Sequence, residues 1–166
     1  GCVRNSAAWG DGIYKSTDAG KTFVHMGLAD SHHIGRVVTH PTNPDIVYVA
    51  AQGHLWGYNQ ERGVFKSTDG GKTWKKLTGG LPNDTRTGAG DLVMDPANPN
   101  ILYANLWERI RKPYTFESGG PSGGLFKTTN GGDTWTKLGG GLPTGPTGKI
   151  GLTIFRWFTP NDVFPV

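Results

Sequence analysis

The sequence predicts an all-β fold built from four-stranded antiparallel units, and two observations support this prediction. First, one hairpin pattern occurs three times, as GIYKSTDAGKTFVHM (12–26), GVFKSTDGGKTWKKL (63–77) and GLFKTTNGGDTWTKL (124–138). Each copy has two short runs of β-branched and aromatic residues around a turn rich in Gly and Asp or Asn, which is typical of a tight β-hairpin. Second, two more apolar runs joined by a Pro-Asn turn precede the second and third copies.

The turn of each hairpin has the chemistry of an Asx turn. Asp18, Asp69 and Asn130 occupy equivalent positions, and such side chains accept hydrogen bonds from backbone N–H groups ahead of them. An aromatic residue follows each turn, and we expect it to fold under the turn and bury a large apolar area. The residues to which we assign this structural role are Ser16, Asp18, Phe23, Ser67, Asp69, Trp74, Thr128, Asn130 and Trp135.

The strands that complete each unit are predicted from the paired apolar runs. IGRVV (34–38) and IVYVAA (46–51) flank the turn HPTNPD, and DLVM (91–94) and ILYANL (101–106) flank DPANPN in the same way. With the hairpin that follows, each pair forms a four-stranded unit. Such a unit, recurring every ~50–60 residues, is typical of a blade of a β-propeller. A β-sandwich or an open meander gives no reason for the whole unit to recur.

About three blades are predicted in the whole chain, 1–166. The first hairpin (12–26) precedes full blade units at about 33–77 and 89–138 and a half blade at 149–166, in which IGLTI (150–154) is a predicted strand. Closed propellers typically have four to eight blades. The chain is therefore expected to be a partial propeller whose remainder belongs to a longer chain, or a ring closed by self-association of copies.

The repeated turn resembles the Asp-box (BNR) repeat. The pattern Ser/Thr-x-Asp/Asn-x-Gly-x-Thr-aromatic fits three eight-residue windows, at 16–23, 67–74 and 128–135, with Phe23 in place of Trp in the first. This repeat is found in sortilin-like and glycosyl-hydrolase-like β-propellers related to sialidases and xyloglucanases. The resemblance covers roughly 9–152 and implies that the Asp box is a structural turn remote from the active centre.

Composition excludes several classes of protein. The 17 basic and 13 acidic residues give a net charge of +4, and Lys15, Lys66 and Lys127 repeat in the first hairpin strand, where we interpret them as a solvated face that resists aggregation. Without a basic block or a known module, no nucleic-acid partner is expected. The single cysteine, Cys2, excludes an internal disulfide framework and a Cys-based zinc site, and we expect it to be a small buried hydrophobe.

Neither a membrane span nor a leader is predicted. No apolar run approaches the ~20 residues needed to cross a bilayer, so membrane insertion is not expected. The N-terminal GCVRNSAAWG lacks a charged region followed by an apolar one, so no signal peptide is visible.

Antiparallel order places the tight Asp-box and Pro-Asn turns on one face and the long irregular loops on the other, where binding residues are expected. Trp56 and Trp107 follow corresponding strands and are candidate platforms for sugar rings; the alternative is that they fill the space between blades. Arg109 and Arg111 are candidates to clamp a carboxylate, or they belong to a solvated salt-bridge cluster. The candidate ligand-binding residues are His33, His54, Trp56, Trp107, Arg109 and Arg111.

Catalytic residues are not identified by any motif. Asp91 starts an inner strand, and with Glu108 it is a candidate acid–base pair for glycoside hydrolysis, which needs two carboxyl groups about 5–9.5 Å apart; Asp91 also fits a role as a cap of the turn after Gly90. No metal site is expected, because the adjacent His32 and His33 would point to opposite faces of a strand and no HExxH-like spacing occurs.

The resemblance implies two functions, neither with a cofactor. The first is an extracellular ligand-binding or structural propeller segment that recognises a polysaccharide or a peptide through the long loops. The alternative is a glycoside hydrolase that acts on a polysaccharide with carboxylates at the propeller channel. The Phe-Arg-Ile-Pro motif and the arginine triad of sialidases are missing, and three blades supply only part of a channel, so we favour the first. The family implies a secreted or periplasmic location.

Overall fold

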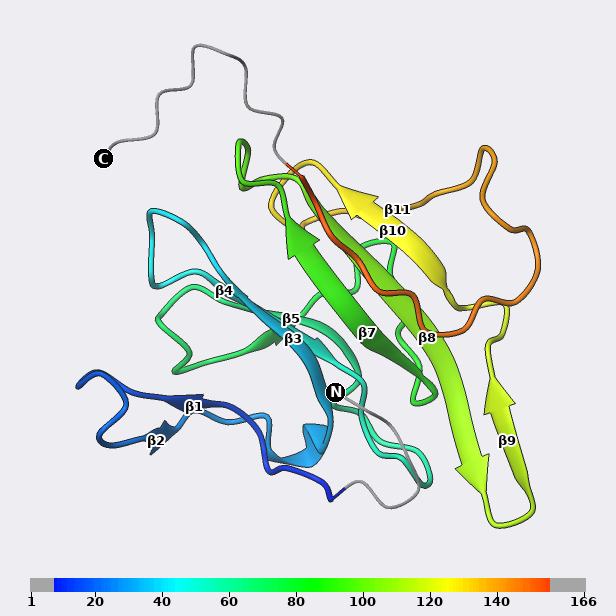
Figure 1. Cartoon of the computed structure of the whole chain (residues 1–166), viewed down its shortest axis with the longest axis horizontal. Helices are drawn as coiled ribbons and strands as arrows, with labels where there is room; N and C mark the ends of the chain where they lie inside the picture. The colour runs from blue at the N-terminus through cyan, green and yellow to red at the C-terminus, as the bar shows by residue number, and fades with distance from the viewer. Residues whose placement is uncertain (1–7, 156–166) are drawn as a thin grey trace.

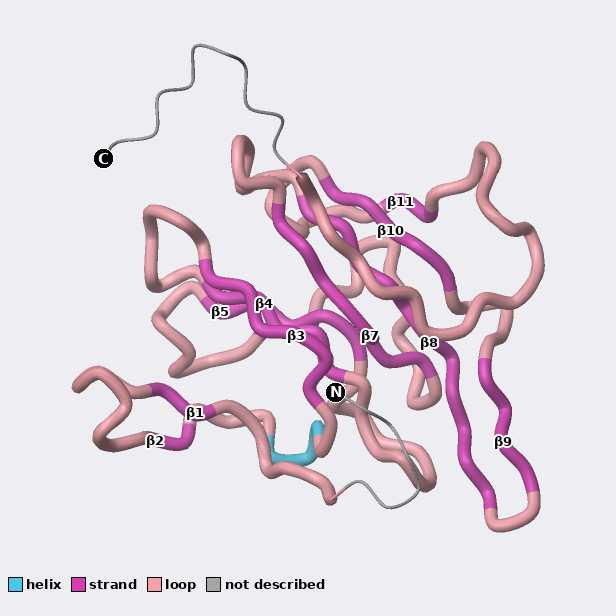
Figure 2. Tube along the Cα trace, in the orientation of Figure 1, coloured by secondary structure: helices cyan, strands magenta, loops and turns pink. Residues whose placement is uncertain are grey.

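The computed structural model describes residues 8–155, which form an all-β molecule with one short 3₁₀ turn (Figures 1 and 2). This confirms the predicted fold class. Within these residues, no helix is long and apolar enough to cross a membrane. The elements are β1 (Tyr14–Lys15), β2 (Val24–His25), η1 (Ala29–Ser31), β3 (Ile34–Thr39), β4 (Val47–Ala51), β5 (Gly63–Ser67), β6 (Lys75–Lys76), β7 (Thr87–Met94), β8 (Leu102–Lys112), β9 (Thr115–Ser118), β10 (Gly124–Thr128) and β11 (Thr136–Lys137).

Antiparallel pairing arranges these strands in sheets. One sheet has the order β3-β4-β5-β6, a second has the order β7-β8-β10-β11, with β9 paired to β8, and β1 pairs with β2. The repeated sequences occupy the same places in the two larger sheets. Across the first sheet the register aligns Val37, Val49 and Phe65, and across the second it aligns Leu92, Ala104 and Phe126.

Alternate residues of the central strands are buried in two different cores. Tyr48 and Ala50 on β4 pack with Leu92 and Leu106 of the second sheet. Val49 and Ala51, which point to the other face of β4, form a smaller core with Leu28 and Phe65, against which Ile13 next to β1 packs. The first large sheet is therefore covered on both faces by its neighbours, as the blade of a propeller is.

The inner strands β3 and β7 approach so closely that one position requires glycine. A Cβ atom on Gly35 would lie 2.4 Å from the carbonyl oxygen of Gly90, which is closer than non-bonded atoms can approach. Arg36 and Asp91 follow these two glycines, and Arg36 Nε donates a hydrogen bond to Asp91 Oδ1 at 2.9 Å. The inner strands of consecutive units are therefore tied together at the same level.

Each Asp-box turn is closed by a similar set of side-chain hydrogen bonds. In the second box, Ser67 Oγ accepts a hydrogen bond from the N–H of Gly71 at 2.8 Å. Asp69 accepts bonds from both the N–H and the hydroxyl of Thr73, at 2.9 and 2.6 Å. The first box repeats this pattern. In the third, Thr128 and Asn130 accept the same N–H bonds, but Asn130 Nδ2 donates to Thr134 Oγ1 at 2.8 Å instead of accepting from it. The geometry of these turns agrees with the structural role that we assign to them.

Consecutive Asp-box turns are linked by a repeated lysine. Lys15 Nζ donates to the carbonyl of Gly70 at 3.2 Å, and Lys66 Nζ donates to the carbonyl of Gly131 at 2.8 Å. Since residues 15 and 66 are equivalent in the repeat, and so are 70 and 131, each lysine bonds the turn of the following unit. Lys15 is exposed, as our interpretation of a solvated face expects, and Lys66 is half-buried, but each of them also links two turns.

The aromatic residues after the turns differ in burial because their neighbours differ. Trp135 is 5% exposed and lies in the main core, with its indole N–H bonded to the carbonyl of Gly132 at 3.0 Å. Trp74 packs on the first hairpin and donates to the carbonyl of Met26. Phe23 is 62% exposed, since no described sheet lies beyond β1 and β2. Burial of this aromatic therefore requires a preceding sheet.

Two segments differ from their predicted structure. Residues 107–124, which lie between the predicted strand 101–106 and the third hairpin and in which no strand is predicted, begin with the second half of β8 and continue into β9, forming a hairpin that extends beyond the sheet (Figure 1). The predicted strand at 150–154 is not a strand. Its N–H groups at Ile150 and Leu152 bond the side chains of Asn105 and Asp91 in place of a neighbouring strand.

The division of the chain into blade units stays a prediction. The two larger sheets span 34–76 and 87–137, inside the predicted units 33–77 and 89–138 except at the start of β7. The predicted half blade at 149–166 lies partly outside the described residues, and Cys2 lies outside them altogether.

Candidate functional site

The long loops gather at the end of the molecule opposite the Asp-box turns (Figure 1). We call this end the long-loop face; it consists of residues 27–33 with η1, the loop 52–62 between β4 and β5, the loop 78–86 before β7, and the hairpin of β8 and β9 with the loop that follows it. It holds all six candidate ligand-binding residues: His33 in the segment before β3, His54 and Trp56 in the loop 52–62, and Trp107, Arg109 and Arg111 on β8. The structure describes all six.

A buried arginine organises the loop 52–62. Arg62 is 0% exposed, and none of the carboxylates in residues 8–155 forms an ion pair with its guanidinium. Burial, together with the nearby Arg109, lowers the pKa of Arg62 to about 10, so the side chain stays charged at neutral pH. Its five hydrogen bonds, of 2.7–3.3 Å, go to Asn59 Oδ1 and to the carbonyl oxygens of Gln52, His54, Gly57 and Arg86. One cation thus fixes the shape of the loop.

Two of the predicted ligand-binding residues are buried in this arrangement. Trp107 is 6% exposed, and its indole N–H donates to Ser118 Oγ at 3.2 Å. Arg109 is 1% exposed, stacks its guanidinium over the ring of Trp107 at 5.1 Å and donates to the carbonyl of His54 at 2.9 Å. Trp107 therefore fills the space between elements, which is the alternative that the sequence left open, and Arg109 supports the loop from below.

Exposed aromatic side chains lie against the second predicted arginine, Arg111. Its guanidinium carbon lies 5.8 Å from the centre of the Trp56 ring and 5.3 Å from that of Phe116. Trp56 is 44% exposed and comes from the loop 52–62, whereas Phe116 is on β9 opposite Arg111. Tyr58 and Tyr114, which are more exposed still, flank this group in the chain. We call Trp56, Tyr58, Tyr114 and Phe116, with Arg111, the aromatic patch.

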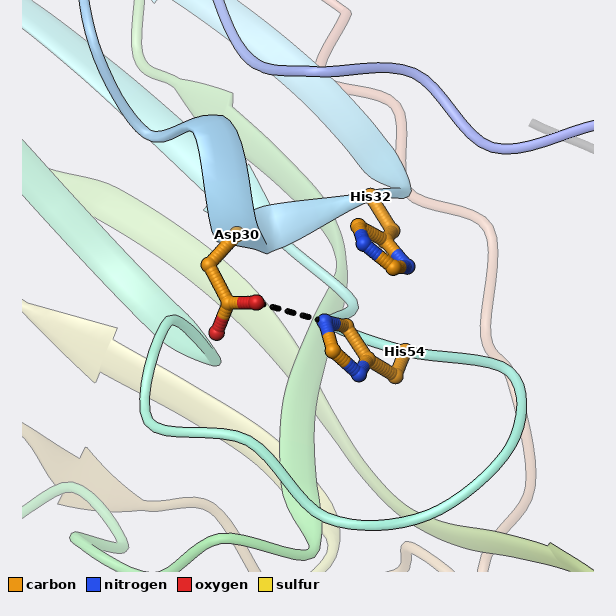
Figure 3. A group of neighbouring side chains, drawn as sticks. All are labelled: Asp30, His32 and His54. Atoms are coloured by element: carbon orange, nitrogen blue, oxygen red, sulfur yellow. Dashed lines mark hydrogen bonds and ion pairs between the residues drawn. The ribbon is translucent and has the colours of Figure 1, made fainter.

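The histidines form a stacked cluster beside this loop (Figure 3). His54 Nε2 lies 2.8 Å from Asp30 Oδ1, and the ring of His32 stacks on that of His54 at 3.6 Å between centroids. Burial and the neighbouring His54 lower the pKa of His32. The ring of His33 instead bonds the carbonyl of Gly53 at 3.1 Å through Nδ1, and its Nε2 is buried without a partner. Burial also lowers the pKa of His33.

Asp30, His32 and His54 are the described residues that come nearest to a metal-binding set. One donor atom of each lies within 4.8 Å of the others, and imidazole with carboxylate is a donor set that suits zinc. The two imidazole planes, however, are only 15° from parallel. Lone pairs in the planes of stacked rings do not converge on one point, and His54 Nε2 already bonds Asp30. In this arrangement the cluster is a hydrogen bond between His54 and Asp30 with ring stacking of His32 on His54.

The two candidate catalytic carboxylates are not arranged as a pair. Asp91 is 7% exposed and accepts hydrogen bonds from Arg36, from its neighbour Leu92 N–H and from Leu152 N–H. Burial alone would raise its pKa, but the bonds from Arg36 and the two N–H groups outweigh burial and lower the pKa of Asp91. A carboxylate held in this way is a poor general acid.

Glu108 lies on β8, the strand next to that of Asp91, and at a different level along the sheet. It is opposite Thr87 in the register, whereas Asp91 is opposite Asn105, so about 10 Å of strand separates the two levels. Glu108 Oε1 lies 3.4 Å from Arg86 Nε, and Oε2 accepts from the N–H of Ser122 at 3.3 Å. Since the two carboxylates share no partner and each is engaged by its own arginine, the structure does not bring them together as an acid–base pair.

A groove of about 500 Å³ runs along the inner strands β3 and β7 and beside residues 152–154. Most of its lining is apolar, and Arg36 and Asp95 are its charged residues. It lies toward the Pro-Asn turns, away from the aromatic patch. It therefore does not join the candidate carboxylates to the long-loop face.

Sequence reasoning did not single out several residues that shape the site. Arg62 precedes the repeated Gly63, and its bonds to carbonyl groups depend on the folded shape of its own loop. Phe116 pairs with Arg111 across the hairpin of β8 and β9, and that hairpin was not predicted. Tyr58 belongs to the loop 52–62, which no sequence spacing relates to β8 and β9.

Comparisons with known proteins agree with the fold and with the repeated turns. The family model described as Sortilin-Vps10 (sortilin, neurotensin receptor 3) matches residues 11–142. The chain is 32% identical over 148 residues to a xyloglucanase of Hypocrea jecorina, which covers 81% of this chain and 16% of that protein. It is 30% identical over 123 residues to a xyloglucanase of Paenibacillus sp, which covers 70% of this chain and 10% of that protein.

Among solved structures, an ancestral GH74 enzyme superposes with a TM-score of 0.56 at 22% identity, over 77% of this chain and 15% of that one. This likeness confirms the predicted β-propeller fold. The chain spans 16% or less of the length of each of these three relatives. Because the family model covers most of the chain, as the repeated Asp boxes predict, the protein belongs to the Sortilin-Vps10 family.

Proposed function

We propose that this chain is a ligand-binding segment of a β-propeller that holds a glycan on its long-loop face, over the aromatic patch. The observation that carries the proposal is the contrast in exposure between two groups of aromatic residues. Trp74 and Trp135 of the Asp boxes pack against neighbouring sheets. Trp56 and Tyr58 on the loop 52–62, and Tyr114 and Phe116 on the hairpin of β8 and β9, all leave two fifths or more of their surface open to solvent.

Exposed aromatic rings suit a sugar ligand for a physical reason. The flat face of a ring packs on the apolar C–H face of a pyranose and removes both from water, while its polar edge remains solvated. The cluster sits on a fixed base, since the buried Arg62 holds the loop of Trp56 and β8 pairs with β9 beneath Phe116. The relatives named xyloglucanases support a glycan in preference to a peptide as the ligand.

The test is a binding assay with polysaccharides. Calorimetry with xyloglucan and a panel of plant and microbial glycans should reveal at least one saturable ligand. Trp56→Ala should weaken that ligand about tenfold or more, which is about 1.4 kcal/mol. Phe23→Ala is the matched control, because Phe23 is also an exposed aromatic but lies on the Asp-box rim. Equal loss with both variants, or saturable binding of peptides and no glycan, would reject the proposal.

Glycoside hydrolysis is the second candidate, and it is favoured by the relatives, which are named as xyloglucanases and a GH74 enzyme. The geometry of Asp91 and Glu108 does not support it. Release of reducing sugar from the same panel is the measurement that decides. If the protein cleaves a polysaccharide and the double variant Asp91→Asn, Glu108→Gln cleaves it at the same rate, another pair of residues performs the chemistry. If nothing is cleaved and binding is saturable, the segment binds without turnover.

We also propose an extracellular or periplasmic location, which suits a protein that meets polysaccharides. For assembly, we propose that a longer chain or further copies complete the ring, since about two and a half units do not close a propeller. Light scattering on the purified protein distinguishes these: a compact monomer mass excludes closure by further copies.

A further inference from the structure

Arg111 differs from the other described arginines in what it binds. Arg36 is paired with Asp91, and Arg86 with Glu117 at 2.6 Å. The buried Arg62 and Arg109 donate to backbone carbonyl groups. Within residues 8–155, Arg111 takes part in none of the ion pairs, and its Nε is buried without a hydrogen-bond partner. No described group accepts from its two Nη groups either, so the outer edge of this half-buried guanidinium is left without an acceptor.

The nearby acidic groups are already engaged. Glu117 accepts from Arg86 through one oxygen and from Lys112 through the other, the latter at 3.3 Å. Glu108 lies between Arg86 and the N–H of Ser122. If Glu117 turned to bind Arg111, both Arg86 and Lys112 would lose their contact with its carboxylate. An acceptor for Arg111 must therefore come from outside the described chain.

The aromatic neighbours determine which side of the guanidinium is available. Trp56 and Phe116 lie over Arg111 at 5.8 and 5.3 Å, and a guanidinium held against aromatic faces by cation–π attraction keeps only its N–H edge free. A planar carboxylate binds that edge with two parallel hydrogen bonds and continues the same plane. A tetrahedral sulfate projects oxygen atoms out of that plane, where the rings lie.

We propose that Arg111 selects an acidic glycan, by binding the carboxylate of a uronic acid residue whose sugar ring packs on Trp56. The inference rests on the proposed function of the aromatic patch and narrows it to a substrate class. The net charge of +4 adds a weaker, non-directional attraction for the same polymers. Neutral glycans are left with the stacking contacts alone.

The test compares one polymer in two forms, polygalacturonate and the same polymer after reduction of its carboxyl groups. Calorimetry at about 0.15 M salt limits long-range attraction, since the Debye length there is about 8 Å. The acid form should bind at least about tenfold more tightly than the reduced form, a difference of about 1.4 kcal/mol.

Three variants locate the effect. Arg111→Gln removes the charge and should bring the acid form down to the affinity of the reduced form. Arg111→Lys retains the charge without the fork and should recover only part of the preference. Lys72→Gln removes a charge from an exposed residue of an Asp-box turn and should leave the preference unchanged. Circular dichroism confirms that each variant is folded before its affinity is compared.

The outcomes separate this inference from the proposed function. If both forms of the polymer bind equally, or Arg111→Gln keeps the preference, carboxylate selection is wrong while glycan binding stands. If Lys72→Gln loses as much affinity as Arg111→Gln, the attraction is non-specific and the inference fails. If a sulfated polymer binds with the same affinity as polygalacturonate, Arg111 does not select carboxylates over other anionic groups, and the inference of carboxylate selection is rejected. If neither this polymer nor any glycan of the panel binds, the proposed function itself is rejected.

Discussion

Replacement of Arg62 by Met tests whether one buried cation holds the loop that carries Trp56. Met retains an apolar stem but removes all five hydrogen bonds of the guanidinium. A buried acceptor that loses its donor costs about 1–3 kcal/mol, so the gross loss is about 5 kcal/mol or more. Release of a cation buried without a carboxylate returns several kcal/mol. The expected net destabilisation of Arg62→Met is therefore about 3–5 kcal/mol.

Chemical denaturation of the purified protein measures this free energy, and a thermal scan should show a melting temperature lower by roughly 6–20 °C for a chain of this size. Arg62→Lys should fall between Met and the original residue, because an ammonium has three donors for five acceptors. Lys72→Met, at the surface, is the control for loss of a cation. If Arg62→Met unfolds within about 0.5 kcal/mol of the original, which is the range of surface substitutions, the guanidinium does not organise the loop.

Three further predictions test other parts of the structure. Trp135→Ala should lower the free energy of unfolding by about 3–5 kcal/mol, whereas Phe23→Ala, at the equivalent but exposed position, should change it by no more than about 0.5 kcal/mol; equal costs in urea denaturation would contradict the packing. Bonds from Thr22 and Ser16 lower the pKa of Asp18 to about 2, so the contribution of its carboxylate to stability is complete above its unfolded pKa of about 3.9 and is lost as the pH falls through about 2. In acid unfolding followed by circular dichroism, the stability of Asp18→Asn should therefore depend less steeply on pH than that of the original protein. An unchanged curve would show that the carboxylate of the Asp box is not coupled to folding. Burial lowers the pKa of His32, so the unfolded state binds its proton more tightly and stability falls as the pH drops below about 6.5; an NMR titration of the ring that gives a midpoint at or above that value would refute this.

The fold was predictable because its information is local and repeated. A turn such as 67–74 specifies its own hydrogen bonds, through Ser67, Asp69 and Thr73, within eight residues. Three copies at equivalent spacing then imply equivalent sheets. The segment 150–154 resisted prediction for the opposite reason. Its sequence suits a strand, but its N–H groups at Ile150 and Leu152 bond the side chains of Asn105 and Asp91, which are distant in sequence.

The candidate site was predicted only in part, because it depends on contacts between loops. Trp56 is exposed as a platform must be, whereas Trp107, at a corresponding place in the repeat, is buried once β9 folds beside it. The alternation of side chains along a strand does not by itself predict that Arg109 is buried while Arg111 is accessible. The pairing of His54 with Asp30 joins residues 24 positions apart, and no sequence spacing indicated it.

The lysine links between consecutive Asp-box turns have a consequence for how such chains change during evolution. Since Lys15 and Lys66 join turns at a constant place in the repeat, the rim of turns keeps one geometry from unit to unit. The second interval of the repeat is longer than the first, and the extra residues all fall before β7 and between β8 and β10, at the other end of the molecule. Insertions there leave the linked rim untouched, so one end can diversify freely while the other preserves the architecture.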